Sequence, residues 1–183
     1  MDKRIARGQQ SRAKFKEAFL DLIQTEEPGD ITVTELCRKT GLNRSTFYAH
    51  FGYIDRLIRE VLWESVGRVT EGYGTQWDLP LENGGVDRSS IAVYLHRLLN
   101  DPTVRRFCTC TDSASYRDLI IRAHIELTLG TSVDPVRYSI AYIHNAGVLS
   151  FVFEWIKNGP HITEEAVVEI IHEFSKVMYR PLS

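Results

Sequence analysis

The chain has 183 residues, of which 43% are hydrophobic and 25% charged, and its formal net charge at pH 7 is -2. This composition is typical of a globular protein, so it excludes an intrinsically disordered chain and a polyanion binder that relies on overall charge. The first 51 residues nevertheless hold nine Lys and Arg against seven Asp and Glu. Many of these cations form a basic arm that could contact phosphates or simply be a solvated tail: Lys3, Arg4, Arg7, Arg12, Lys14 and Lys16.

Three observations bear on the compartment. No apolar run approaches the ~20 residues of a membrane-spanning helix. The polar start of the chain has no apolar stretch behind it that would indicate a secretory signal. The cysteines, Cys37, Cys108 and Cys110, are an odd set without the spacing of a disulfide framework. We therefore expect a cytoplasmic protein with no membrane partner.

The first helix is expected over residues 10–26, where apolar residues recur at helical spacing. Pro28-Gly29 would end it. Thr32 then begins a short second helix, because Glu35 follows three residues later as in a capping box; Thr34 is a competing N-cap.

The second helix would end at Gly41, a residue that readily adopts the left-handed conformation of a helix stop. Asn43 would cap a third helix through Phe51. Two short helices joined by a turn of about three residues are the layout of a helix-turn-helix.

The rest of the chain predicts further helices. Residues 74–87 are rich in Gly, Asn, Asp and Pro and predict a loop. Asp101-Pro102 and Asp134-Pro135 each place a capping Asp before a Pro that suits the first helical position. No segment alternates with period two, so the predicted fold class is all-α. The other helices are expected over residues 54–73, 91–99, 113–129, 134–157 and 163–179.

The third helix has the composition of a recognition helix. Phe47 and Phe51, at i and i+4, would both face the core and meet Leu36. The opposite face is polar and small, as entry into the major groove requires: Asn43, Arg44, Ser45, Thr46, Tyr48 and Ala49. On chemical grounds Arg44 could pair with guanine and Asn43 with adenine, while the hydroxyl side chains could bind bases or phosphates.

Residues 11–57 resemble the TetR family of bacterial transcription regulators. The resemblance rests on the spacing from Ile31-Thr32-Val33 through Gly41 to residues 45–51 and Asp55-Arg56-Leu57. It implies that Thr34 and Tyr48 bind phosphates with help from His50, and that residues 43–49 read bases. Many family members have Lys where this chain has Ile54, so Arg56 or the basic arm would have to replace that phosphate contact.

The resemblance also implies a domain organisation. We expect a three-helix headpiece over residues 1–53 and a helical-bundle dimerisation and effector domain over residues 54–183. The helices at 134–157 and 163–179 carry apolar side chains on more than one side, which suits an isologous four-helix interface, or burial within one monomer. The expected interface residues are Ile140, Val148, Phe151, Val152, Trp155, Val167, Ile171 and Phe174.

The predicted function is that of a homodimeric transcription regulator, a repressor released from double-stranded operator DNA by an unknown small-molecule effector. The alternative is a regulator whose body responds to a protein partner instead. Aromatic residues could line an effector cavity or form ordinary core: Trp63, Tyr94, Phe107, Tyr116, His124 and Tyr142.

Catalysis and metal binding have little support in the sequence. It contains no nucleophile elbow, no phosphate-cradling glycine loop and no HExxH motif. Cys108 and Cys110 are separated by one residue, whereas zinc ligand pairs are usually separated by two to four, and no second pair follows. We therefore expect no enzyme activity, no cofactor and no metal.

Overall fold

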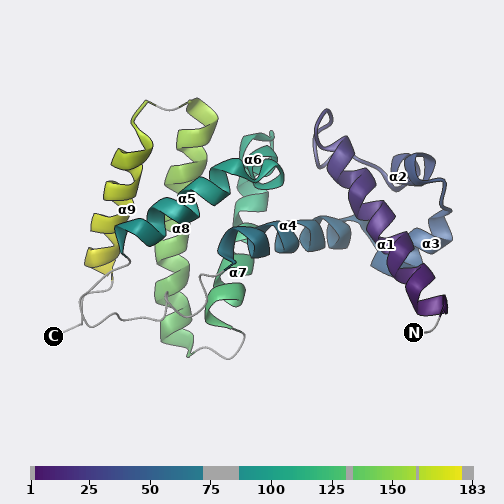
Figure 1. Ribbon diagram of the computed structural model, residues 1–183, viewed down its shortest axis with the longest axis horizontal. Helices are drawn as coiled ribbons and strands as arrows, with labels where there is room; N and C mark the ends of the chain where they lie inside the picture. Colours follow the sequence, from purple (N-terminus) through teal and green to yellow (C-terminus); the bar gives the residue numbers. More distant parts are fainter. Residues whose placement is uncertain (1–2, 72–86, 131–133, 160, 179–183) are drawn as a thin grey trace. The chain divides into compact units, whose positions relative to one another are not determined.

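The computed structural model describes residues 3–71, 87–130, 134–159 and 161–178, which form nine α-helices and no strand (Figure 1). The predicted all-α class is confirmed. The chain divides into two compact units, which we call the N-terminal unit (residues 1–62 and 110–112) and the C-terminal unit (residues 63–109 and 113–183). The helices are α1 (Lys3–Leu22), α2 (Val33–Thr40), α3 (Arg44–Phe51), α4 (Ile54–Thr70), α5 (Arg88–Asn100), α6 (Pro102–Thr109), α7 (Ser113–Leu129), α8 (Pro135–Asn158) and α9 (Glu164–Met178).

Helix α1 differs from the prediction at both ends. It begins at Lys3 rather than near residue 10, so the predicted basic arm is part of a helix. The residues before position 10 are mostly good helix formers, and their polar side chains gave no apolar periodicity by which to recognise the helix. The helix ends at Leu22, and turns such as the bond from Asp30 N to Glu27 O (3.0 Å) lead to α2.

The ends of α2 are as predicted. The Thr32 hydroxyl accepts from Glu35 N (3.3 Å), and Glu35 Oε2 accepts from Thr32 N (2.8 Å), which completes the capping box. These hydrogen bonds hold the pKa of the Glu35 carboxyl below its usual value. Thr34 therefore lies inside the helix and is not the N-cap. Gly41 ends the helix with φ of 69°, where a side chain would be strained.

The core of the N-terminal unit is built around aromatic rings. Phe47 and Phe51 of α3 are fully buried, as their i, i+4 spacing predicted, and so is Leu36 of α2. Phe15 of α1 meets the Phe47 ring edge to face, with centroids 5.2 Å apart. This packing buries one side of α3 and leaves its opposite side exposed.

In the C-terminal unit, α5 packs against α9, α6 against α7 and α8, and α8 against both α7 and α9 (Figure 1). Helices α7 and α8 begin where the sequence predicted, and α5 begins three residues earlier than predicted, after Asp87. The predicted loop at 74–87 lies outside the described residues except for Asp87, which caps α5 through Ser90 N (3.0 Å). None of the described helices is long and apolar enough to cross a membrane.

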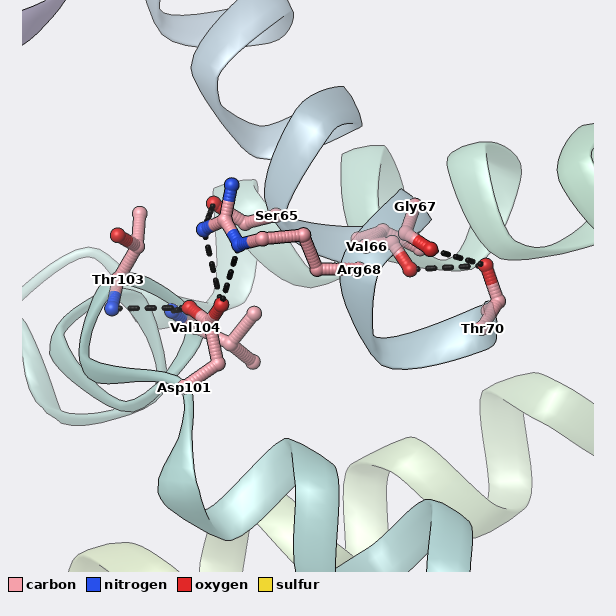
Figure 2. Close-up of polar contacts among 8 residues, drawn as sticks. All are labelled: Ser65, Val66, Gly67, Arg68, Thr70, Asp101, Thr103 and Val104. Carbon is pink, nitrogen blue, oxygen red and sulfur yellow. Dashed lines mark hydrogen bonds and ion pairs between the residues drawn. The ribbon is translucent and has the colours of Figure 1, made fainter. Parts of the chain in front are cut away.

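Asp101 connects the end of α4 to the start of α6 (Figure 2). Its Oδ1 accepts from the backbone N–H groups of Thr103 (3.0 Å) and Val104 (2.9 Å), which confirms the predicted cap. Its Oδ2 accepts from Arg68 Nε (3.2 Å) and Nη2 (2.9 Å), and the same guanidinium donates to Ser65 Oγ (2.8 Å). The Asp101 side chain is 8% exposed and that of Arg68 is 55% exposed, so only the carboxylate of this ion pair is shielded from water.

Candidate nucleic-acid interface

The exposed side of α3 carries the residues predicted to read DNA. Asn43, Arg44, Ser45, Tyr48 and Ala49 are exposed, with Tyr48 50% accessible, whereas Thr46 and His50 are half-buried. A helix face of small and polar side chains in front of a buried aromatic core has the shape and chemistry to enter a major groove.

Thr34 and Arg44 contact each other. The Arg44 guanidinium donates to Thr34 Oγ1 across the turn between α2 and α3. The sequence assigned these residues to different partners, a phosphate for Thr34 and a base for Arg44. In the structure both reach one place at the N-terminal ends of the two helices, where backbone N–H groups also favour an anion.

Asn43 is the N-cap of α3, and this role limits the hydrogen bonds that its side chain can form with a base. Its Oδ1 accepts from the backbone N–H of Thr46 (2.8 Å) and from the Thr46 hydroxyl (2.8 Å), so both lone pairs are used by the N-cap. A bidentate contact with adenine needs Oδ1 and Nδ2 together. In this conformation Asn43 offers only its amide N–H groups outward.

Arg12 and Glu60 form a contact that the sequence did not predict: Arg12 was considered only as part of the basic arm, and Glu60 was not singled out. Arg12 Nη1 donates to the backbone carbonyl of His50 in the last turn of α3 (3.2 Å), and Arg12 also forms an ion pair with Glu60 of α4. Positions 12 and 60 are 48 residues apart, so no local spacing rule relates them. The only signal was the basic character of α1, which suggested a phosphate contact instead.

The predicted dimer-interface residues fall into two groups. Val152, Trp155, Val167 and Ile171 are buried within the chain itself, and Trp155 Nε1 donates to Ile162 O (3.2 Å). The other four, Ile140, Val148, Phe151 and Phe174, are only partly covered. Gly147, Val148, Phe151, Ile170, Ile171 and Phe174 line an apolar hollow of about 210 Å³ between α8 and α9.

The predicted effector residues do not all lie together. Tyr94 and His124 are buried and joined by a hydrogen bond between the Tyr94 hydroxyl and His124 Nδ1 (3.1 Å). Phe107 and Tyr116 form an edge-to-face pair with centroids 4.6 Å apart. The remaining two are at the periphery: Trp63 is 39% exposed, and Tyr142 donates from its hydroxyl to Asp118 (2.8 Å).

The cysteines and metal-ligating side chains show no assembled centre among the described residues. Cys108 and Cys110 are fully buried, and Cys37 is half-buried with the pKa of its thiol raised by burial. In the part of the chain that the structure describes, no three His, Cys, Asp or Glu side chains gather as metal ligands do.

Comparison with known proteins places the fold. A crystal structure of a TetR transcriptional regulator from Rhodococcus sp. RHA1 superimposes with a TM-score of 0.58 over 96% of this chain and 99% of that one, at 14% identity. An uncharacterized HTH-type transcriptional regulator of Bacillus subtilis (strain 168), YxbF, is 26% identical over 72 residues, which span 39% of this chain and 18% of that protein. No protein-family model matches the sequence. The TetR-type fold expected from residues 11–57 is thus confirmed.

Proposed function

We propose that this chain is a DNA-binding transcription regulator of the TetR type. The observation that carries the proposal is the exposed polar face of α3, supported from behind by the fully buried Phe47 and Phe51. An α-helix that presents its N-terminal residues in this way can place them against base edges. The similarities support the same conclusion, because the Rhodococcus protein of similar fold is a TetR transcriptional regulator and YxbF is an HTH-type transcriptional regulator.

The contacts to DNA divide by chemistry. Arg44 leaves Thr34 and reads a guanine, because a guanidinium matches the two acceptors of that base edge. Thr34, Tyr48 and His50 bind phosphates, which set the register of the helix without reading sequence. Ser45, Thr46 and Ala49 form the close-fitting part of the face, with Asn43 contributing its amide group.

Two copies of the chain pair through α8 and α9. Five large apolar side chains on these helices remain exposed in the single chain: Val136 (66%), Ile143 (57%), Ile170 (46%), Phe174 (37%) and Val177 (67%). Together with the apolar hollow at Gly147 they form an apolar surface whose exposure to water is unfavourable, and a second copy of the chain would bury it. A twofold dimer then presents two recognition helices to half-sites about 34–36 Å apart.

The domain boundary near residue 53, the repressor role and the effector belong to the same proposal. Effector binding in the C-terminal domain would favour a dimer in which the two α3 helices no longer match successive major grooves. Tyr94, His124 and Phe107 are the buried part of the predicted cavity lining, and the half-buried Tyr116 packs against Phe107. The alternative is a protein partner in place of the small molecule. A thermal-shift screen with metabolites and drugs distinguishes the two, because a small molecule that binds the folded chain raises its melting temperature.

DNA selection tests the central proposal. The full chain is incubated with random double-stranded oligonucleotides, and bound duplexes are enriched and sequenced over several rounds. We expect an inverted repeat whose half-site centres are one helical turn apart. Enrichment of no sequence over the starting pool would overturn the proposal.

Sedimentation tests the dimer separately. Ile143→Asp or Val177→Asp should yield monomers, since each puts a charge in the proposed interface. Val93→Asp is the matched control, because Val93 is 47% exposed but lies on α5. A wild-type chain that sediments as a monomer at micromolar concentration and still binds the selected duplex would contradict the paired arrangement.

A further inference from the structure

The last turn of α3 is held by a side chain from another helix. The final four carbonyls of an α-helix have no partner within the helix, and His50 contributes one of them. Arg12 of α1 donates to that carbonyl from Nη1 (3.2 Å), and its guanidinium carbon lies 5.0 Å from the centroid of the Phe51 ring. A cation at the C-terminal end of a helix is also favoured by the helix dipole. Arg12 therefore contacts α3 twice, through a backbone atom and a core ring.

Arg12 is in turn oriented by Glu60 of α4. The Glu60 carboxylate pairs with Arg12 through Oε1 and lies 3.3 Å from Lys16 Nζ through Oε2. Arg56, one turn earlier on α4, approaches Oε1 at 3.5 Å. The Glu60 side chain is 21% exposed and that of Lys16 16%, so these contacts are partly shielded from solvent. The Glu60 carboxylate thus pairs with three cationic side chains, two from α1 and one from α4.

This arrangement has two effects that bear on DNA. It fixes where Arg12 sits and hence how the end of α3 is oriented against α1 and α4. It also compensates part of the local positive charge, which would otherwise attract any phosphate backbone regardless of sequence. Both effects favour binding that depends on the face of α3 over binding that depends on charge alone.

We propose that Glu60 is a positioning residue for α3, which holds Arg12 on the last turn of the recognition helix and so sustains discrimination between operator and random DNA. The proposal rests on the proposed DNA-binding function. Glu60 does not contact DNA in this proposal; it acts through Arg12. The opposing account is that Arg12 contacts a phosphate itself, as the basic arm suggested, and that Glu60 merely neutralises it.

The test compares two substitutions with the same change of charge. Glu60→Gln keeps the size of the side chain and removes its charge, and Glu17→Gln does the same at an exposed position of α1 outside the cluster. Each full-length variant is titrated by fluorescence anisotropy with the duplex selected by the wild type and with a scrambled duplex. We expect Glu60→Gln to lower the ratio of the two affinities at least tenfold, by weaker operator binding and stronger scrambled binding. Glu17→Gln should leave the ratio within twofold of the wild type.

Amide hydrogen exchange reads the position of α3 without DNA. The N–H of Gly52 closes α3 on Tyr48 O (2.9 Å), and the N–H of Gly41 closes α2 on Cys37 O (2.9 Å). We expect Glu60→Gln to speed exchange at Gly52 several-fold more than at Gly41, because only the end of α3 loses its support. Arg12→Gln should have the same effect, and the double variant should add nothing to it, since both changes break one contact.

The outcomes separate the two proposals. An unchanged affinity ratio for Glu60→Gln, or equal acceleration at Gly52 and Gly41, overturns the positioning role. If Glu60→Gln fails to fold, the exchange rates at Gly52 and Gly41 are compared in Arg12→Gln instead. Should the wild type select no duplex, the DNA-binding proposal fails, while the exchange at Gly52 still decides whether Glu60 orients α3.

Discussion

Acid should weaken the C-terminal unit through two buried histidines. His124 of α7 is 2% exposed and His144 of α8 is 1% exposed, and each is hydrogen-bonded: His124 Nδ1 to the Tyr94 hydroxyl (3.1 Å), and His144 Nε2 to Ser175 Oγ (2.8 Å). Burial lowers the pKa of each imidazole to about 4, and the neighbouring His144 adds to the lowering for His124. Both rings are therefore neutral in the folded protein at pH 7.

The sign of the effect follows from proton binding. In the unfolded chain these histidines titrate near the ordinary value of 6.5, so between pH 6.5 and about 4 the unfolded state binds protons that the folded state does not. The free energy of unfolding is thus unaffected above pH 7 and falls as the pH drops below 6.5. At pH 5 the loss is on the order of 2 kcal/mol for each histidine.

Urea unfolding at pH 7.5 and pH 5.0, followed by circular dichroism at one protein concentration, measures this loss. In the double variant His124→Gln with His144→Gln, both positions stay neutral at both pH values. Its free energy of unfolding should therefore fall less than that of the wild type between pH 7.5 and pH 5.0, by on the order of 4 kcal/mol. His96→Gln, at an exposed position on α5, is the matched control and should behave as the wild type. Equal losses in the wild type and the double variant would refute the reasoning.

Three further predictions concern DNA binding and the link at Asp101. Arg44→Ala should lower the free energy of DNA binding by ~1–3 kcal/mol and relax base preference at one position of each half-site, whereas Tyr48→Phe should weaken binding to all sequences alike. Repeated DNA selection with each variant measures this, and an unchanged base preference for Arg44→Ala would contradict base reading. Affinity for the selected duplex should fall ~10³–10⁵-fold between 50 and 200 mM salt if a dimer neutralises about 6–10 phosphates, and a flat response in anisotropy titrations would exclude that electrostatic contribution. Asp101→Asn should lower the free energy of unfolding by ~1–3 kcal/mol, because it weakens both the α6 cap and the Arg68 pair; urea unfolding measures it, with Asp134→Asn as the control that changes a cap without an Arg68 partner.

The elements that could be predicted from the sequence are those whose causes are local. Thr32 with Glu35, Asn43 with Thr46 and the Asp101 cap each join residues at most three positions apart, and all three are present. The buried side of α3 followed in the same way from the i, i+4 spacing of its two phenylalanines. The spacing of nearby residues was therefore enough to predict these helix caps and the exposed face of α3.

Other features depended on contacts between distant positions. The start of α1 was missed, because its first turns are polar and gave no periodic signal. The width of the apolar surface on α8 did not tell which side the chain itself would cover: Val152 and Trp155 lie in the interior, while Ile143 stays 57% exposed. An apolar side chain suits a core and an interface equally, so its hydrophobicity alone cannot choose between them.

The sequence by itself determined the all-α class, the caps and the polar face of α3, because these follow from backbone hydrogen bonding and helical periodicity within a few residues. Only the tertiary structure decided which polar groups meet: Arg12 with Glu60, Arg44 with Thr34, and Tyr94 with His124. Each pair is brought together by the packing of separate helices. The resulting burial lowers the pKa of His124, and the resulting hydrogen bond and ion pair hold Arg12 on the end of α3.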